Sequence, residues 1–139
     1  MKKIDTREFK MEDLKDSIFK TLLQTNLNGP AFTGYDPETR DVVFCCGVQK
    51  IFNHSGEAWV VLQDKSYIGS FRKVKEILFF LLGIFSRIQA VVDKNTPESI
   101  RFVEHLGFER EGELRRYGPH GEDMIMYAIM GFSREASDA

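Results

Sequence analysis

The most informative part of the chain is NTPESIRFVEHLGFEREGEL, residues 95–114. Thr96 suits the N-cap of a helix, and Pro97 fits the first helical position. Apolar residues then recur along one helical face, namely Ile100, Val103 and Leu106. Gly107 can end the helix in the left-handed conformation, which lets Phe108 fold back onto the last turn. The stretch therefore predicts a short capped helix followed by a strand, a pattern that an ordinary connecting helix would also produce.

Helix and strand patterns alternate through the rest of the sequence. The periodicity predicts a helix at about 11–25, two strands within 41–63 around the turn NHSG, a helix over 70–85, a strand over 87–93, and two final strands within 109–130 around GPHG. In NHSG, Gly56 is available for a positive φ. A long helix between two strands suits a parallel crossover, and the final hairpin is antiparallel. This order predicts an α/β fold with a mixed central sheet.

Composition sets limits on the class of protein. With 139 residues, the chain is expected to form a single domain over 1–133 with a flexible tail at 134–139. A net charge of -2 gives no general attraction to nucleic acid or to an anionic membrane. The nine-residue run ILFFLLGIF (77–85) is too short to span a bilayer, so no membrane role is expected.

Reactive residue types add little by themselves. Cys45 and Cys46 are adjacent and so unsuited to a framework disulfide, which favours a reducing, cytoplasmic location. The histidines and cysteines lack metal-ligand spacing, so no metal site is expected. The apolar helix 77–85 is compatible with burial in the core or with a homodimer contact. A homodimer could also form through a sheet edge.

Taken in order, the C-terminal pieces resemble the C-terminal half of GNAT acetyltransferases, and most closely the branch that acetylates the N-termini of ribosomal proteins. The matching residues are Asn95, Ser99, Ile100, Arg101, Gly107, Phe108, Glu111, Gly112, Leu114, Arg115, Gly121, Asp123 and Tyr127, so the resemblance covers 88–130. It implies a mixed sheet with helices on both faces and a V-shaped cleft between the fourth and fifth strands, at about 58–63 and 87–93.

The resemblance also implies a function and a set of site residues. The function would be direct transfer of an acetyl group from acetyl-CoA to a primary amine, either a protein N-terminus or a small amine. Glu57 would be the general base and Ser99 the general acid. The residues implied in holding acetyl-CoA are Val60, Val61 and Leu62 at the thioester, Tyr67, Gly69, Ser70 and Arg72 at the pyrophosphate, and Asn95 at the pantetheine. Acceptor choice would depend on segments 20–36 and 116–123.

Two features depart from the GNAT pattern. Segment 62–78, LQDKSYIGSFRKVKEIL, contains a single glycine, Gly69, where the family has a Gly-x-Gly or Gly-x-Ala loop. Val103 stands where many members carry the tyrosine that protonates CoA. The GEAW sequence (56–59), the missing loop and the chain length are similar to small GNAT-like proteins of phages and prophages. The alternative is therefore a non-catalytic GNAT-fold protein with a binding or virion role.

Overall fold

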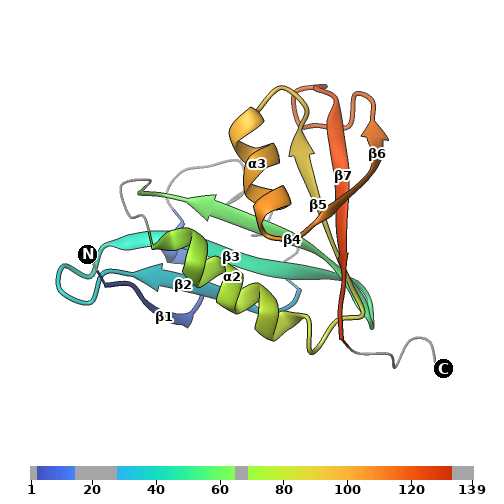
Figure 1. The fold of residues 1–139 in the computed structure, drawn as a ribbon. Helices are drawn as coiled ribbons and strands as arrows, with labels where there is room; N and C mark the ends of the chain where they lie inside the picture. Colours follow the sequence, from blue (N-terminus) through green and yellow to red (C-terminus); the bar gives the residue numbers. More distant parts are fainter. Residues whose placement is uncertain (1–2, 15–27, 65–68, 133–139) are drawn as a thin grey trace. The chain divides into compact units, whose positions relative to one another are not determined.

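The computed structural model describes residues 3–14, 28–64 and 69–132 (Figure 1). The described elements are β1 (Asp5–Glu8), the 3-10 helix η1 (Met11–Asp13), β2 (Ala31–Tyr35), β3 (Val42–Phe52), β4 (Ser55–Leu62), α2 (Ser70–Leu81), β5 (Arg87–Asp93), α3 (Pro97–His105), β6 (Glu109–Leu114) and β7 (Met124–Met130). The helix predicted at 11–25 does not start at Met11 as expected, because η1 ends at Asp13 and Leu14 has extended backbone angles. The rest of that helix and the tail at 134–139 lie outside the described residues.

The strands form one mixed sheet of seven strands in the order β1-β2-β3-β4-β5-β7-β6. The crossover from β4 to β5 is parallel, whereas β5 with β7 and β6 with β7 are antiparallel. The predicted α/β class, the mixed sheet and the antiparallel end are thus confirmed. By contacts, the chain divides into two compact units, unit 1 (Met1–Lys50 with Ala58–Ile77) and unit 2 (Ile51–Glu57 with Leu78–Ala139). The prediction of a single domain stays a prediction.

Unit 1 contains two strands that the sequence pattern did not predict. The strands β1 and β2 pair antiparallel, and β2 pairs in turn with β3. The four residues of β1, DTRE, are polar and give no strand signal, while β2 is interrupted by Gly34. A Cβ at Gly34 would lie 2.1 Å from the ring of Phe44, so the glycine makes room for a core aromatic side chain. Both strands exist because of pairing and packing with distant residues rather than local preference.

A buried carboxylate joins the separate pieces of unit 1. Asp13, 6% exposed, accepts two hydrogen bonds from the Arg7 guanidinium, at 2.6 and 2.9 Å. The Lys10 N–H at 2.9 Å and the Thr33 hydroxyl at 2.8 Å also donate to Asp13 Oδ2. The Gln63 amide donates to the carbonyl oxygen of Asp13 at 2.6 Å. The residues after β1 are thereby tied to β2 and to the end of β4.

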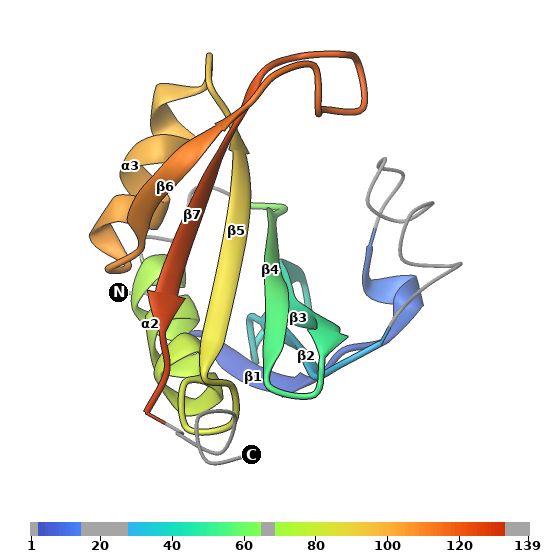
Figure 2. The same ribbon diagram turned by 90° about the vertical axis from the view of Figure 1, so that its right-hand side faces the viewer.

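In unit 2, β5, β7 and β6 lie side by side with α3 along one face (Figure 2). The Tyr127 hydroxyl on β7 donates to Glu104 of α3 at 3.0 Å. The expected end of α3 is confirmed, because Gly107 has φ 103° and the Phe108 N–H donates to the carbonyl of Val103 at 3.1 Å. Thr96 is the N-cap residue, but its side chain makes no capping hydrogen bond.

Three other local predictions were wrong. Helix α2 ends at Leu81 and not at residue 85, because the chain tightens there and the Gly83 N–H bonds back three residues to Phe80. Gly56 has no positive φ, since it lies inside β4 and pairs with Ile88. The final hairpin is more open than predicted, with 115–123 forming its loop. None of the described helices has the length and apolarity needed to cross a membrane.

Candidate functional site

The candidate base Glu57 lies inside β4, near the start of the strand. It is half-buried and pairs in the parallel ladder with Gln89 of β5. The Gln89 side-chain amide donates to Glu57 Oε1 at 3.2 Å. A neutral amide donor at one oxygen holds the carboxylate in a fixed orientation without adding a charge. Glu57 therefore has a defined direction, as a proton acceptor requires.

The hydrogen bonding continues beyond Gln89 along one face of unit 2. Arg87 lies two residues earlier on β5, and two of its nitrogens approach Gln89 Oε1 at 3.4 Å. The Arg87 guanidinium also forms a bidentate pair with Glu111, at 2.7 and 3.0 Å. The hydrogen bond from Arg87 lowers the pKa of Glu111. Arg87 thus orients the oxygen of the Gln89 amide, which leaves the amide nitrogen for Glu57.

The other two predicted site residues of unit 2, Asn95 and Ser99, lie in the connection from β5 to α3 and in the first turn of α3. Asn95 is exposed, and its backbone N–H donates to Asp93 Oδ1 at 2.8 Å. Ser99 is half-buried in the first turn of α3, with its N–H donating to the Thr96 carbonyl at 3.1 Å. Both residues therefore follow the end of the strand whose Gln89 holds Glu57.

Val60, Val61 and Leu62 are the last residues of β4 and belong to unit 1. The parallel ladder between β4 and β5 has three pairs and ends at Glu57–Gln89. Alternate residues of a strand direct their N–H groups to opposite sides. After Glu57, some backbone N–H groups of β4 therefore point to the edge of the strand that pairs with β5 in the ladder. These N–H groups are not part of the three pairs of the ladder.

At the start of α2, Ser70 carries a buried hydroxyl without a partner. The residue is 6% exposed, and within the described ranges its Oγ makes no hydrogen bond. Gly69 precedes it, and a Cβ there would meet Ile4 at an ordinary 3.5 Å. Arg72 follows in the first turn and is exposed. Tyr67 lies outside the described residues. A helix N-terminus favours anions. The start of α2 adds the Ser70 hydroxyl, Gly69 and the cationic Arg72 to this preference.

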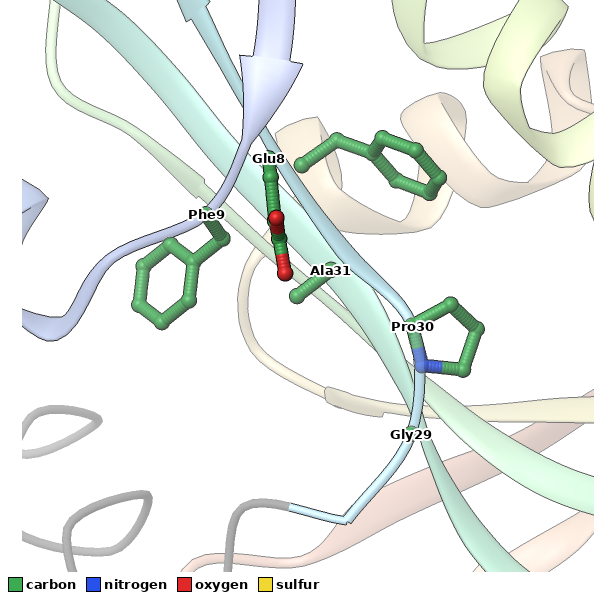
Figure 3. A pocket seen from close by; sticks show the side chains of 6 residues that line it. Glu8, Phe9, Gly29, Pro30 and Ala31 are labelled. Atoms are coloured by element: carbon green, nitrogen blue, oxygen red, sulfur yellow. The ribbon is translucent and has the colours of Figure 1, made fainter.

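A pocket of about 250 Å³ lies in unit 1, and none of the residues predicted for catalysis or cofactor binding lines it (Figure 3). Its lining residues are Glu8, Phe9, Gly29, Pro30, Ala31 and Phe32. Figure 3 shows the Glu8 carboxylate over Ala31, with Phe9 to one side and Pro30 to the other. The Phe9 ring also packs edge-on against Trp59 of β4, with centroids 5.3 Å apart. Four of the lining residues fall in 20–36, where the sequence placed acceptor choice.

The cysteines do not provide a nucleophile. Both thiols are free and buried. Burial raises the pKa of Cys45 to about 11 and that of Cys46 to about 12. Thiols with such values stay protonated at neutral pH, and the thiolate is the reactive form. Among the described residues, none of the histidines, cysteines and carboxylates gather into a potential metal site.

Comparison with known proteins identifies the fold. No family model matches the chain, and no curated protein sequence matches it. Its structure is similar to ribosomal-protein-S5-alanine acetyltransferase from Vibrio fischeri, with a TM-score of 0.72 and 17% identity over 94% of both chains. A GNAT-family acetyltransferase from Bacillus anthracis has a TM-score of 0.70 and 20% identity, over 91% of this chain and 94% of that one. A dodecameric spermidine N-acetyltransferase from Vibrio cholerae has 0.72 and 14%, over 91% and 93%.

These likenesses define the class of structure. The chain has the fold of the GNAT acetyltransferases, as the stretch 95–114 and its flanking strands led us to expect. At identities of 20% or less, the comparisons establish the fold, and activity has to be argued from the site.

Proposed function

We propose that the protein is an N-acetyltransferase that moves an acetyl group from acetyl-CoA to a primary amine. The fold supports this class of reaction, and the start of α2 supports a site for the cofactor. The buried Ser70 hydroxyl, which has no hydrogen-bond partner among the described residues, is the observation that carries the proposal. A buried polar group without a partner costs about 1–3 kcal/mol, which a phosphate oxygen accepting from Ser70 Oγ would offset.

In this proposal, three groups of residues would hold acetyl-CoA. Gly69, Ser70 and Arg72 would hold the pyrophosphate, and the resemblance adds Tyr67 to this group. Backbone N–H groups of Val60, Val61 and Leu62 would hold the pantetheine arm and donate to the thioester oxygen, while Asn95 would orient the arm. Bound acetyl-CoA would supply the activated acetyl group. Donors aimed at a developing oxyanion are typically worth about 3 kcal/mol each.

Proton transfer would fall to two residues of unit 2. Glu57, oriented by Gln89, would take the proton from the attacking amine. Ser99 would donate to the departing thiolate. The pocket beside Glu8 suits an amine with an apolar body, because its lining combines one carboxylate with apolar side chains.

Replacing Ser70 by alanine separates a structural role from a binding role. Without cofactor, Ser70→Ala is expected to leave the melting temperature unchanged or slightly raised, because its hydroxyl makes no hydrogen bond to the described part of the chain. Its affinity for acetyl-CoA, measured by calorimetry, is expected to fall about tenfold through loss of a bond to a charged phosphate.

Two further variants complete this test. Gly69→Trp should abolish binding by filling the approach to α2, whereas Gly69→Ala should keep the fold, because its Cβ has room beside Ile4. If the wild-type protein shows no binding at millimolar acetyl-CoA, the enzymatic proposal is wrong. The non-catalytic GNAT-fold protein suggested by the phage-like features would then be the better reading.

The role of Gln89 can be tested by a double-mutant cycle. Gln89→Leu is expected to lower kcat about tenfold, with unchanged affinity for acetyl-CoA, because Glu57 loses the donor that orients it. In the Glu57→Gln background, the same substitution should have little further effect, since there is no carboxylate left to orient. Additive losses in the double variant would show that Gln89 acts independently of Glu57.

A further inference from the structure

Unit 2 carries large apolar side chains that are exposed at the end of α2, in the turn after it and after β7, here called the aromatic face: Phe79, Phe80, Ile84 and Phe132. Its three phenylalanines are 67%, 60% and 59% exposed. The rings of Phe79 and Phe132 lie against each other, with centroids 5.0 Å apart. The Phe132 N–H donates to the Leu82 carbonyl at 2.7 Å, which fixes the chain after β7 against the end of α2. Phe79 and Phe132 therefore form one continuous apolar surface, and Phe80 and Ile84 follow Phe79 directly in the chain.

The composition of this surface changes sharply along α2. The exposed positions of its first half are charged, namely Arg72, Lys75 and Glu76. The exposed positions that follow are Phe79 and Phe80, while Leu78 and Leu81 of the same turns face the core. If only solvent covered α2, charged residues could occupy all of its exposed positions. The change from charged to aromatic on the outward side marks a surface that another molecule covers.

The size of the aromatic face is right for a protein contact. Taking about 200 Å² for a phenylalanine side chain, the face exposes roughly 450 Å² of apolar surface. A standard interface buries about 800 Å² on each partner, and the polar rim supplies the remainder. The exposed Gly83 lies between Phe80 and Ile84 and lets a partner approach closely.

We infer that the aromatic face is an isologous dimer interface, occupied by the same face of a second copy of this chain. The face itself contains no charged side chain, so it offers nothing for a partner of opposite charge to recognise. Charges of both signs, Lys75 and Glu76, border it, which disfavours an anionic membrane surface. A second copy presents the same apolar area and the same mixed rim, and two-fold symmetry matches them.

The described sheet edge in unit 2 is the other possible dimer contact, and the sequence of its edge strand argues against such a contact. Strand β6 ends the sheet and exposes Glu109, Arg110, Glu111 and Glu113. Charged edge strands resist pairing with another chain. Of the two dimer modes that the sequence left open, the structure therefore favours the apolar helix. This inference does not depend on acetyl transfer.

Sedimentation equilibrium of the full chain tests the inference. At about 100 µM, where mass action favours association, the wild-type protein should be a dimer. Phe79→Glu should weaken dimerisation about 100-fold, because a charge would be buried without a partner in each half of the interface. Tyr117→Glu is the matched control, since Tyr117 is a 57% exposed aromatic residue of unit 2 outside the aromatic face. That variant should remain a dimer.

Cysteine cross-linking gives an independent readout. Both native cysteines are buried, so an introduced surface thiol reports by itself. Ile84→Cys should form a disulfide-linked dimer on mild oxidation, whereas Tyr117→Cys should stay monomeric on a non-reducing gel. A monomeric wild-type protein at about 100 µM would overturn the inference. So would a dimer insensitive to Phe79→Glu, or a wild-type monomer that binds lipid vesicles through this face.

Discussion

Glu57→Gln is expected to lower kcat/KM for acetyl transfer by about 10²–10⁴-fold, the usual contribution of a positioned general base. Glutamine keeps the size of the side chain and can still contact Gln89, so the β4–β5 ladder should persist. It cannot take the proton from the attacking amine. The loss should therefore appear in kcat, with acetyl-CoA affinity by calorimetry equal to that of the wild type.

The pH dependence distinguishes a lost base from a disturbed site. At alkaline pH a growing share of the acceptor is already the neutral amine, so the rate of Glu57→Gln should recover toward that of the wild type. The control is Glu109→Gln, which removes an exposed strand carboxylate of the same unit and should leave kcat unchanged. A Glu57→Gln enzyme with near wild-type kcat at neutral pH would exclude Glu57 as the base.

Asp13→Ala is expected to lower the free energy of unfolding by about 3 kcal/mol, since buried hydrogen bonds to a charged group are worth about 1.5–3 kcal/mol and are not additive. The substitution removes the acceptor of Arg7, Lys10 and Thr33 together. The buried Thr33 hydroxyl then loses its charged partner, whereas the partly exposed Arg7 can be hydrated. Urea denaturation at neutral pH measures the loss.

The same carboxylate makes stability depend on pH in a defined direction. Burial by itself would raise the pKa of Asp13, but hydrogen bonds from Arg7, Lys10 and Thr33 outweigh it, and the pKa is lowered. A lowered folded-state pKa means that the stabilisation is complete above the unfolded value, about 3.9, and is lost as pH falls through the folded value. The gap between wild type and Asp13→Asn should therefore narrow in acid. Asp41→Asn, at an exposed position, should show no such trend.

Much of the fold follows from local signals in the sequence. The helix starting after Thr96, its end at Gly107 and the strand that follows depend on backbone preferences and capping within a few residues. The α/β order depends in the same way on the periodicity of apolar residues over short windows. The resemblance in 88–130 depends on the order and spacing of these local signals. The fold could therefore be predicted although no family model or curated sequence matches the chain.

Other features exist only through contacts between residues far apart in the chain. Strands β1 and β2 have weak strand patterns, and their pairing with β3 is what makes them strands. Gln89 carries no signal of its own, because it meets Glu57 only through the register of a parallel ladder 32 residues away in sequence. The buried Ser70 hydroxyl and the exposed Phe79 are likewise decided by what packs against α2. Local preference sets which segments are helix or strand, whereas burial and register, which need the whole chain, decide which side chains are buried, paired or left free.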